Sequence, residues 1–206
     1  MSSLLNPLRG LVRESSILDN TFQLNLSLLQ VSQGQDRHAR YVCEMCVIRL
    51  LDSWARFNRE VIFLSAGARA VTQSGVRLPL APNINTRADV LPVLRMTYRT
   101  PPRYEPKWAI AAQCIDAAQR LRVQNLGTLS AALGAANSPA DELRLVRNFL
   151  AHRTEEARRP LQVHPVFAAI RNCAIECTAG MVMAGGVLRF SVWVRGLNAV
   201  AQACTS

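Results

Sequence analysis

A stretch of six residues brings together side chains that can cut RNA: it runs from Arg147 to His152 and includes Asn148. The neutral imidazole of His152 titrates near physiological pH, so it can remove the proton of a ribose 2'-hydroxyl, which then attacks the adjacent phosphate. Arg147 stays charged and offers a planar fork of donors that matches phosphate oxygens, so it can stabilise the added negative charge. Asn148 can orient the phosphate or the ribose. This chemistry leaves a 2',3'-cyclic phosphate and a 5'-hydroxyl and needs no metal or other cofactor.

A purely structural role for the same residues stays open at this point. Arg147 would then pair with an acidic neighbour, Asn148 would cap a contact, and His152 would be a hydrogen-bonded histidine of an interface.

Local rules place these residues on one amphipathic helix. Ser138 can act as the N-cap, Pro139 suits the first helical position, and Asp141 follows the cap by three residues, a variant of the capping box. Apolar residues then recur at spacings of three and four, which predicts a stripe buried against neighbouring helices. The stripe consists of Leu143, Val146 and Leu150.

The polar face of this helix is suited to dimerisation. At about 100° per residue, Arg147 lies beside the buried stripe and His152 lies a further ~140° round. Asn148 and the small Ala151 fall between them. Two copies of such a face can approach closely, and a dimer formed there would have a cleft lined by Arg147 and His152 from both chains.

An arginine followed by a polar residue, with a histidine after four intervening positions, resembles the signature of HEPN domains, a family whose name refers to nucleotide binding in higher eukaryotes and prokaryotes. Family members are all-helical, many are metal-independent endoribonucleases that work as dimers, and many act as toxins or in defence against phage. The resemblance is sharp only from Arg147 to His152. It implies RNA as the substrate, a composite active site made by a homodimer, and, for a toxin, an antitoxin or other inhibitor protein as a partner.

Charge is consistent with a nucleic-acid partner. The net charge is +10 and the chain has a single lysine, Lys107, so arginine supplies almost all the positive charge. Arginine binds phosphates and stacks on bases, although a GC-rich genome would give the same bias. Three further arginines fall on the same helical arc as Arg147, together with Glu155. We expect these arginines either to contact RNA or to form a solvated charged face; they are Arg144, Arg158 and Arg159.

Length and composition indicate one domain over residues 1–206, because half of the residues are hydrophobic and can fill a sizeable core. The N-terminus lacks the basic and apolar segments of a secretory signal. The apolar run from Cys177 to Leu188 is too short to cross a bilayer. We therefore expect a cytoplasmic protein that does not associate with membranes.

Two pairs of cysteines have spacings that occur in zinc sites, namely Cys43 with Cys46 and Cys173 with Cys177. Both pairs lie in stretches that are predicted to be helical, without a glycine-rich knuckle. The favoured interpretation is that the thiols pack as small buried hydrophobes and that the chain has no metal site.

Hydrophobic periodicity predicts an all-α, HEPN-like bundle of about six helices with one long irregular insertion at about 67–106. The insertion would fold over the cleft, swap between protomers, bind an inhibitor or form a surface elaboration. Its basic and aromatic residues can hold phosphates and stack bases; they are Arg95, Tyr98, Arg99, Arg103 and Tyr104. The expected helices cover about 7–33, 36–66, a short piece at 87–94, 105–124, the motif helix, 165–183, and a last one around 190–197. A linker with Gly127 and Gly134 is expected before the motif helix. His164 precedes Pro165 at the expected start of the helix over 165–183, which favours a capping or turn role over catalysis.

Two other functions stay open. A HEPN-like bundle without catalysis would bind RNA, a nucleotide or a partner protein without turnover. A DNA-binding protein would explain the arginine content, but no helix-turn-helix signature stands out. Phosphate loops, dinucleotide fingerprints, metalloprotease helices and nucleophile elbows are absent from the sequence, and its acidic residues are scattered rather than paired for two-metal chemistry.

Overall fold

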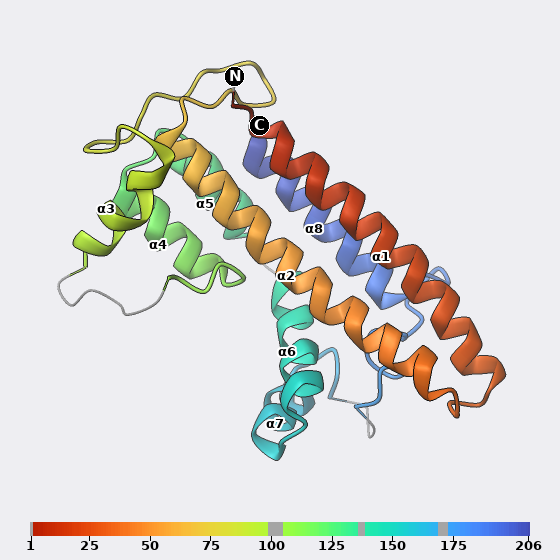
Figure 1. The fold of residues 1–206 in the computed structure, drawn as a ribbon. Coiled ribbons are helices and arrows are strands. Elements are labelled where there is room, and N and C mark those ends of the chain that lie inside the picture. The colour runs from red at the N-terminus through yellow and green to blue at the C-terminus, as the bar shows by residue number, and fades with distance from the viewer. Residues whose placement is uncertain (1, 99–104, 136–138, 169–172) are drawn as a thin grey trace. The chain divides into compact units, whose positions relative to one another are not determined.

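The computed structural model describes residues 2–98, 105–135, 139–168 and 173–206, and these ranges contain eight α-helices, one short 3-10 helix and no strand. The predicted all-α class is therefore confirmed, whereas the predicted number of about six helices is too low. Figure 1 shows the elements in chain order. They are α1 (Leu5–Val31), α2 (Arg37–Gly67), η1 (Arg87–Asp89), α3 (Val90–Met96), α4 (Ala111–Leu121), α5 (Leu126–Leu133), α6 (Pro139–His152), α7 (Glu155–Val163) and α8 (Arg189–Thr205).

The chain divides into two compact units. Unit 1 contains residues 1–12, 54–138 and 198–206, and unit 2 contains residues 13–53 and 139–197. Helices α1, α2 and α8 each contribute residues to both units. The single domain expected over residues 1–206 stays a prediction.

Aromatic packing fills the core of unit 1. Trp54 and Phe57 of α2 stack with ring centroids 5.5 Å apart, and Phe63 meets Trp108 edge to face at 5.8 Å. The buried amide of Asn58 donates to the carbonyl oxygen of Trp108 at 2.8 Å. These contacts hold the segment before α4 against the C-terminal half of α2.

The predicted insertion at 67–106 is irregular only in part. Residues 68–86 contain no helix, but η1 and α3 form where a short helix was expected. Asp89 explains their start, because its Oδ2 accepts hydrogen bonds from the backbone N–H groups of Thr86 and Asn85 at 2.8 and 3.2 Å. Arg99, Arg103 and Tyr104 lie outside the described residues.

Helix α5 lies where the sequence predicted a glycine-containing linker. Arg122 adopts a left-handed conformation (φ 54°) and ends α4, after which α5 begins at Leu126. Gly127 falls in the first turn of α5 and Gly134 directly follows its end. The prediction of a linker was wrong because neither glycine interrupts the helix.

Unit 2 is built around α1, α8 and the N-terminal half of α2. Phe22 stacks on Phe190 with ring centroids 4.3 Å apart, and Trp193 packs edge to face on Phe190. The thiol of Cys43 lies 3.8 Å from the carbonyl oxygen of Phe22. The helix predicted over 165–183 is wrong: residues 165–168 and 175–180 form turns, and residues 169–172 lie outside the described ranges.

Candidate active site on helix α6

Helix α6 begins at Pro139, as predicted, while the proposed N-cap Ser138 lies outside the described residues. The predicted apolar stripe is confirmed, since Leu143 and Val146 are fully buried and Leu150 is nearly so. The helix therefore presents its other face, which includes the motif residues, away from the core of unit 2.

The N-terminal half of α6 is fixed to α8 by a buried polar cluster. Oε2 of Glu142 accepts hydrogen bonds from Arg189 Nη1 at 2.6 Å and from Trp193 Nε1 at 2.8 Å. Arg189 is only 5% exposed, so its charge depends on this carboxylate. Gly196 permits the close approach of the two helices, because a Cβ at that position would lie 2.5 Å from Cγ of Pro139.

The C-terminal end of α6 is fixed to α2. Arg153 directly follows the helix with a φ of 48° and forms a 2.6 Å ion pair with Glu44. Thr154 then starts a new helix, since its hydroxyl accepts a hydrogen bond from the backbone N–H of Ala157 at 3.2 Å. Sequence reasoning missed Arg153 and Glu44, which are 109 positions apart and share no local pattern.

Because α6 ends at His152 and α7 is a separate helix, the prediction that Arg158 and Arg159 share one helical arc with Arg147 is wrong. Arg158 and Arg159 belong to α7, which packs against α6 but does not continue it. Arg158 is half-buried and lies 3.7 Å from the carboxylate of Glu155, while Arg159 is exposed. Only Arg144 shares the helix of Arg147, and it lies 3.6 Å from Asp141.

The three motif residues occupy different environments on α6. Arg147 is half-buried, and its Nε is shielded from solvent without a hydrogen-bond acceptor in the described part of the chain. Asn148 is half-buried next to it. His152 is exposed as the last residue of the helix. Arg147 and Asn148 are adjacent in the chain but point about 100° apart, and His152 lies about 40° beyond Asn148 and about 140° from Arg147.

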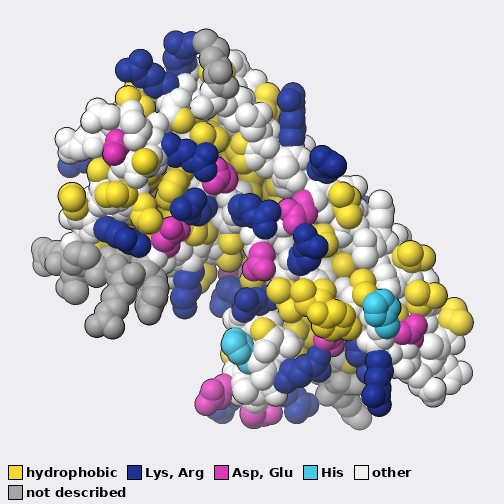
Figure 2. Space-filling view, in the orientation of Figure 1, with side chains coloured by type: hydrophobic (Ala, Val, Ile, Leu, Met, Phe, Trp, Pro, Cys, Tyr) yellow, Lys and Arg dark blue, Asp and Glu magenta, His cyan; other side chains and the backbone are white. Residues whose placement is uncertain are grey.

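Arg147 has no ionic partner among the described residues, a property that it shares with the exposed Arg159 of α7 but not with four other arginines of unit 2. Within the described ranges no carboxylate lies within 4.0 Å of its guanidinium, whereas Arg144, Arg153, Arg158 and Arg189 each have one. Figure 2 shows Asp and Glu side chains beside several of the Lys and Arg side chains on the face in view, while other Lys and Arg side chains there have no acidic neighbour. An arginine that keeps a buried donor free can accept an anionic oxygen.

The predicted packing of the cysteines as buried thiols is confirmed for all except Cys177, which is exposed. Burial raises the pKa of Cys43 to about 12 and that of Cys46 to about 11. Burial likewise raises the pKa values of Cys114 and Cys204 to about 12. The described residues contain no group of three or more metal-binding side chains arranged around one point.

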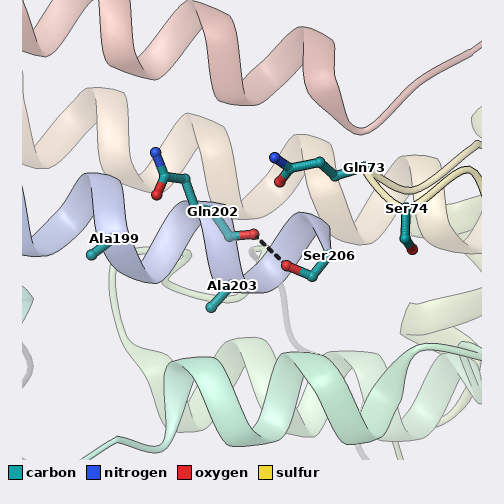
Figure 3. Close-up of a pocket in the computed structure, with 6 residues that line it drawn as sticks. All are labelled: Gln73, Ser74, Ala199, Gln202, Ala203 and Ser206. Atoms are coloured by element: carbon teal, nitrogen blue, oxygen red, sulfur yellow. Dashed lines mark hydrogen bonds between the residues drawn. The ribbon is translucent and has the colours of Figure 1, made fainter.

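The cavities of unit 1 contain none of the predicted site residues. One, of about 530 Å³, is lined by amide, hydroxyl and alanine side chains and has no titratable group (Figure 3). Its lining residues are Gln73, Ser74, Ala199, Gln202, Ala203 and Ser206. A second, of about 430 Å³, contains Arg59 and Arg87, which are already paired with Glu105 and Glu60. Neither lining contains a histidine.

His164 ends α7 and does not begin the helix that the sequence predicted. It is the C-cap residue, its carbonyl oxygen accepts a hydrogen bond from the N–H of Phe167 at 2.8 Å, and its ring lies 5.5 Å from that of Phe167. The expected turn at His164 is thus present, whereas the helix that His164 was expected to open is not.

Among the described helices, none combines the length and the apolar character that crossing a bilayer requires. Comparison of the chain with protein-family models, with curated proteins and with solved structures gave no match.

Proposed function

We propose that the protein is a metal-independent endoribonuclease whose active site forms between the α6 helices of two copies. The observation that carries this proposal is the shielded Nε of Arg147, which has no acceptor in the described residues, on the same helix as an exposed histidine. A donor shielded from water without an acceptor costs about 1–3 kcal/mol, and a bound phosphate oxygen would remove that cost. Arg147 would therefore bind the phosphate that is attacked and stabilise its negative charge.

His152 is the general base of this proposal. Within one chain it points about 140° away from Arg147, so the two side chains do not face one reacting atom from a single helix. A second α6 packed across Ala151 would place His152 of one copy beside Arg147 of the other. Asn148 would orient the phosphate or ribose in the same cleft.

The wider interface would use arginines of both helices at this end of unit 2. Arg144 on α6 and Arg158 and Arg159 on α7 would contact phosphates along the RNA strand. Arg144 and Arg158 would exchange their long ion pairs, at 3.6 and 3.7 Å, for phosphate contacts. The HEPN resemblance extends the proposal to a toxin or antiphage effector that is held in check by an antitoxin or inhibitor protein.

A second candidate is a HEPN-like module that binds RNA, a nucleotide or a partner without cleaving RNA. The observation that favours it is the environment of His152, whose imidazole has no hydrogen-bond partner in the described residues. A catalytic base is normally oriented by a second group. In this candidate Arg147 binds phosphate and His152 contributes nothing to turnover.

Cleavage of labelled RNA in EDTA separates the two candidates. We expect the wild-type protein to leave 2',3'-cyclic phosphate ends, and His152→Ala to cut on the order of 10²–10⁴-fold more slowly. Arg147→Ala should lose a similar factor because the phosphate charge is no longer stabilised. The exposed residues His38 and Arg9 provide matched controls, and His38→Ala and Arg9→Ala should cut like wild type. RNA that is bound but stays intact with all five proteins would favour the binding module.

A further inference from the structure

Helix α1 has a second apolar face whose residues are exposed in the described part of unit 2. Four large apolar residues on it are exposed: Ile17 at 55%, Leu24 at 65%, Leu28 at 47% and Val31 at 86%. We call these four residues the α1 seam. The buried face of α1 lies on the other side of the helix and includes Leu18, Phe22, Leu26 and Leu29. Figure 2 shows hydrophobic side chains gathered over the C-terminal half of α1.

The spacing of the seam is that of a coiled coil. Ile17, Leu24 and Val31 are seven residues apart, and Leu28 follows Leu24 by four. Apolar residues at alternating spacings of three and four pack into the holes of a facing helix. Thr21 occupies the remaining position of this repeat, so the seam covers two heptads.

Three polar side chains beside the seam are already hydrogen-bonded within α1. Within α1, the hydroxyl of Thr21 donates to the carbonyl oxygen of Ile17 at 2.8 Å and that of Ser27 donates to Gln23 at 3.0 Å. The amide of Asn25 donates to the carbonyl oxygen of Thr21 at 2.8 Å. A second helix can therefore cover this face without leaving these donors unpaired.

The seam is also free of charge, in a chain whose net charge is +10. Between Ser15 and Val31 the only charged residue is Asp19, and its carboxylate is turned to α8, where it accepts a hydrogen bond from Ser191 at 2.6 Å. In a two-fold interface each residue near the axis meets its own copy, so a charge there would be repelled by an identical one. An uncharged apolar face fits a second copy of the same helix.

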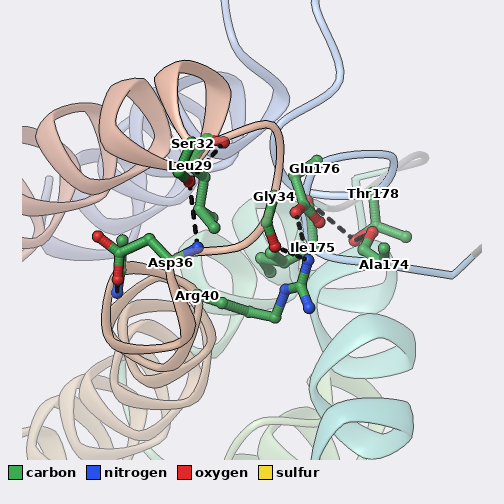
Figure 4. A network of polar contacts seen from close by, with 10 residues as sticks. Leu29, Ser32, Gly34, Asp36, Arg40, Ala174, Ile175, Glu176 and Thr178 are labelled. Carbon is green, nitrogen blue, oxygen red and sulfur yellow. Dashed lines mark hydrogen bonds and ion pairs between the residues drawn. The ribbon is translucent and has the colours of Figure 1, made fainter.

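The turn after the seam is held rigid by unit 2 (Figure 4). Arg40 donates to the carbonyl oxygen of Gly34 at 2.8 Å and pairs with Glu176 at 3.0 Å. Ser32 accepts a hydrogen bond from the backbone N–H of Asp36 at 3.1 Å. The C-terminal end of the seam is thus fixed before a partner binds, which lowers the entropic cost of association.

We infer that the α1 seam is an interface between two copies of this chain. It is a different face from the motif face of α6, so the two contacts would act independently. A protein using both would assemble beyond a dimer. Leu24 lies at the middle of the seam, so a parallel pair of seams in register brings Leu24 against its own copy.

Charge substitutions at Leu24 test this inference through the mass of the full-length protein in solution, measured by light scattering over a range of concentrations. We expect Leu24→Glu and Leu24→Lys each to halve the wild-type mass because like charges meet. An equimolar mixture of the two variants should regain the wild-type mass because opposite charges then meet. Met96→Glu, a change of the same kind at a residue that is 80% exposed on α3, should leave the mass unchanged.

Circular dichroism confirms that each variant retains its helices before its mass is compared. A wild-type protein that is monomeric at every concentration would overturn the inference, as would Leu24 variants that keep the wild-type mass. A mixture that stays at half mass would show that Leu24 does not meet its own copy, and would also overturn it.

Discussion

At the scale of single residues, the guanidinium of Arg147 has no carboxylate partner among the described residues. Arg144, Arg153 and Arg189 each pair with a carboxylate of their own unit, and the most buried of them, Arg189, is held by Glu142. Arg144, Arg147 and Arg189 all have a shielded Nε without an acceptor, but Arg147 alone of these three has no carboxylate partner among the described residues. Because a protein rarely leaves a buried donor unpaired, we interpret Arg147 as a residue that binds an external anion.

Thiol reactivity is predicted at the same scale. Cys43, Cys46, Cys114 and Cys204 are buried with raised pKa values, so at pH 8 they stay protonated and closed to reagents. We expect iodoacetamide to modify the exposed Cys177 first in the folded protein. Mass spectrometry of peptides identifies the modified residue, with protein unfolded in urea as the control. Labelling of Cys114 at the rate of Cys177 would contradict the packing described for unit 1.

The same four thiols predict how stability changes with pH. Their pKa values in the folded state lie above the ordinary value of about 9, so folding favours the protonated thiol. Their contribution is complete below pH 9 and is lost as pH rises from about 9 to about 12. Urea unfolding at pH 8, 9 and 10 should show a midpoint that falls above pH 9. Replacing Cys114 with valine should weaken this fall, whereas Cys177→Ser should not.

At the scale of elements, α6 is a helix fixed at both ends whose motif face is left open. Glu142 ties its first turn to α8, and Glu44 holds the residue that follows its last turn. The motif residues lie between these two anchors. Rigid positioning of this kind is what a site needs if two copies are to meet with their side chains in register.

Loss of the first anchor should be costly. In Glu142→Ala the buried charge of Arg189 and the indole N–H of Trp193 lose their acceptor, so we expect a loss of about 3–5 kcal/mol in the free energy of unfolding. Urea denaturation measures this loss. Glu156→Ala removes an exposed carboxylate from α7 and should change stability by less than about 0.5 kcal/mol. Equal effects of the two substitutions would show that the Glu142 cluster does not hold α6.

Two glycines give a matched test of helix packing. Gly196→Ala places a methyl group 2.5 Å from Cγ of Pro139 and should destabilise the protein by about 1–3 kcal/mol. Gly127→Ala in α5 meets no atom within 4 Å and should stabilise it by about 0.5–1 kcal/mol, since alanine favours the helix. Thermal melts of both variants beside wild type provide the comparison. A stabilising Gly196→Ala would show that α6 and α8 are further apart than described.

The long helices were predictable because their signal is local and repeated. The expected ranges 7–33 and 36–66 differ from α1 and α2 by at most two residues at each end, and Pro139 marked the start of α6. Features that depend on tertiary packing were not predicted from the sequence. Ile175 and Ala179 are buried in turns, yet apolar content alone made their segment look helical. The pairing of Arg153 with Glu44 joins distant parts of the sequence that only the fold brings together.

At the scale of the whole molecule, the proposed activity depends on the association of two copies of the chain. The motif face of α6 carries one Arg147 and one His152 per chain, on different sides of the helix axis, so the proposed chemistry needs a second copy. The +10 net charge would draw RNA to such an assembly and would make its binding sensitive to salt. The uncharged α1 seam offers a separate way for copies to meet.

Mixing two inactive variants tests the central claim, a composite site, most directly. Arg147→Ala and His152→Ala are each expected to be inactive as homodimers. Half of randomly mixed dimers are heterodimers, and each of these has one intact site of two, so the mixture should cut RNA at roughly a quarter of the wild-type rate. If wild type cleaves RNA while the mixture, allowed to exchange subunits, stays as inactive as either variant alone, the composite site between two α6 helices is contradicted.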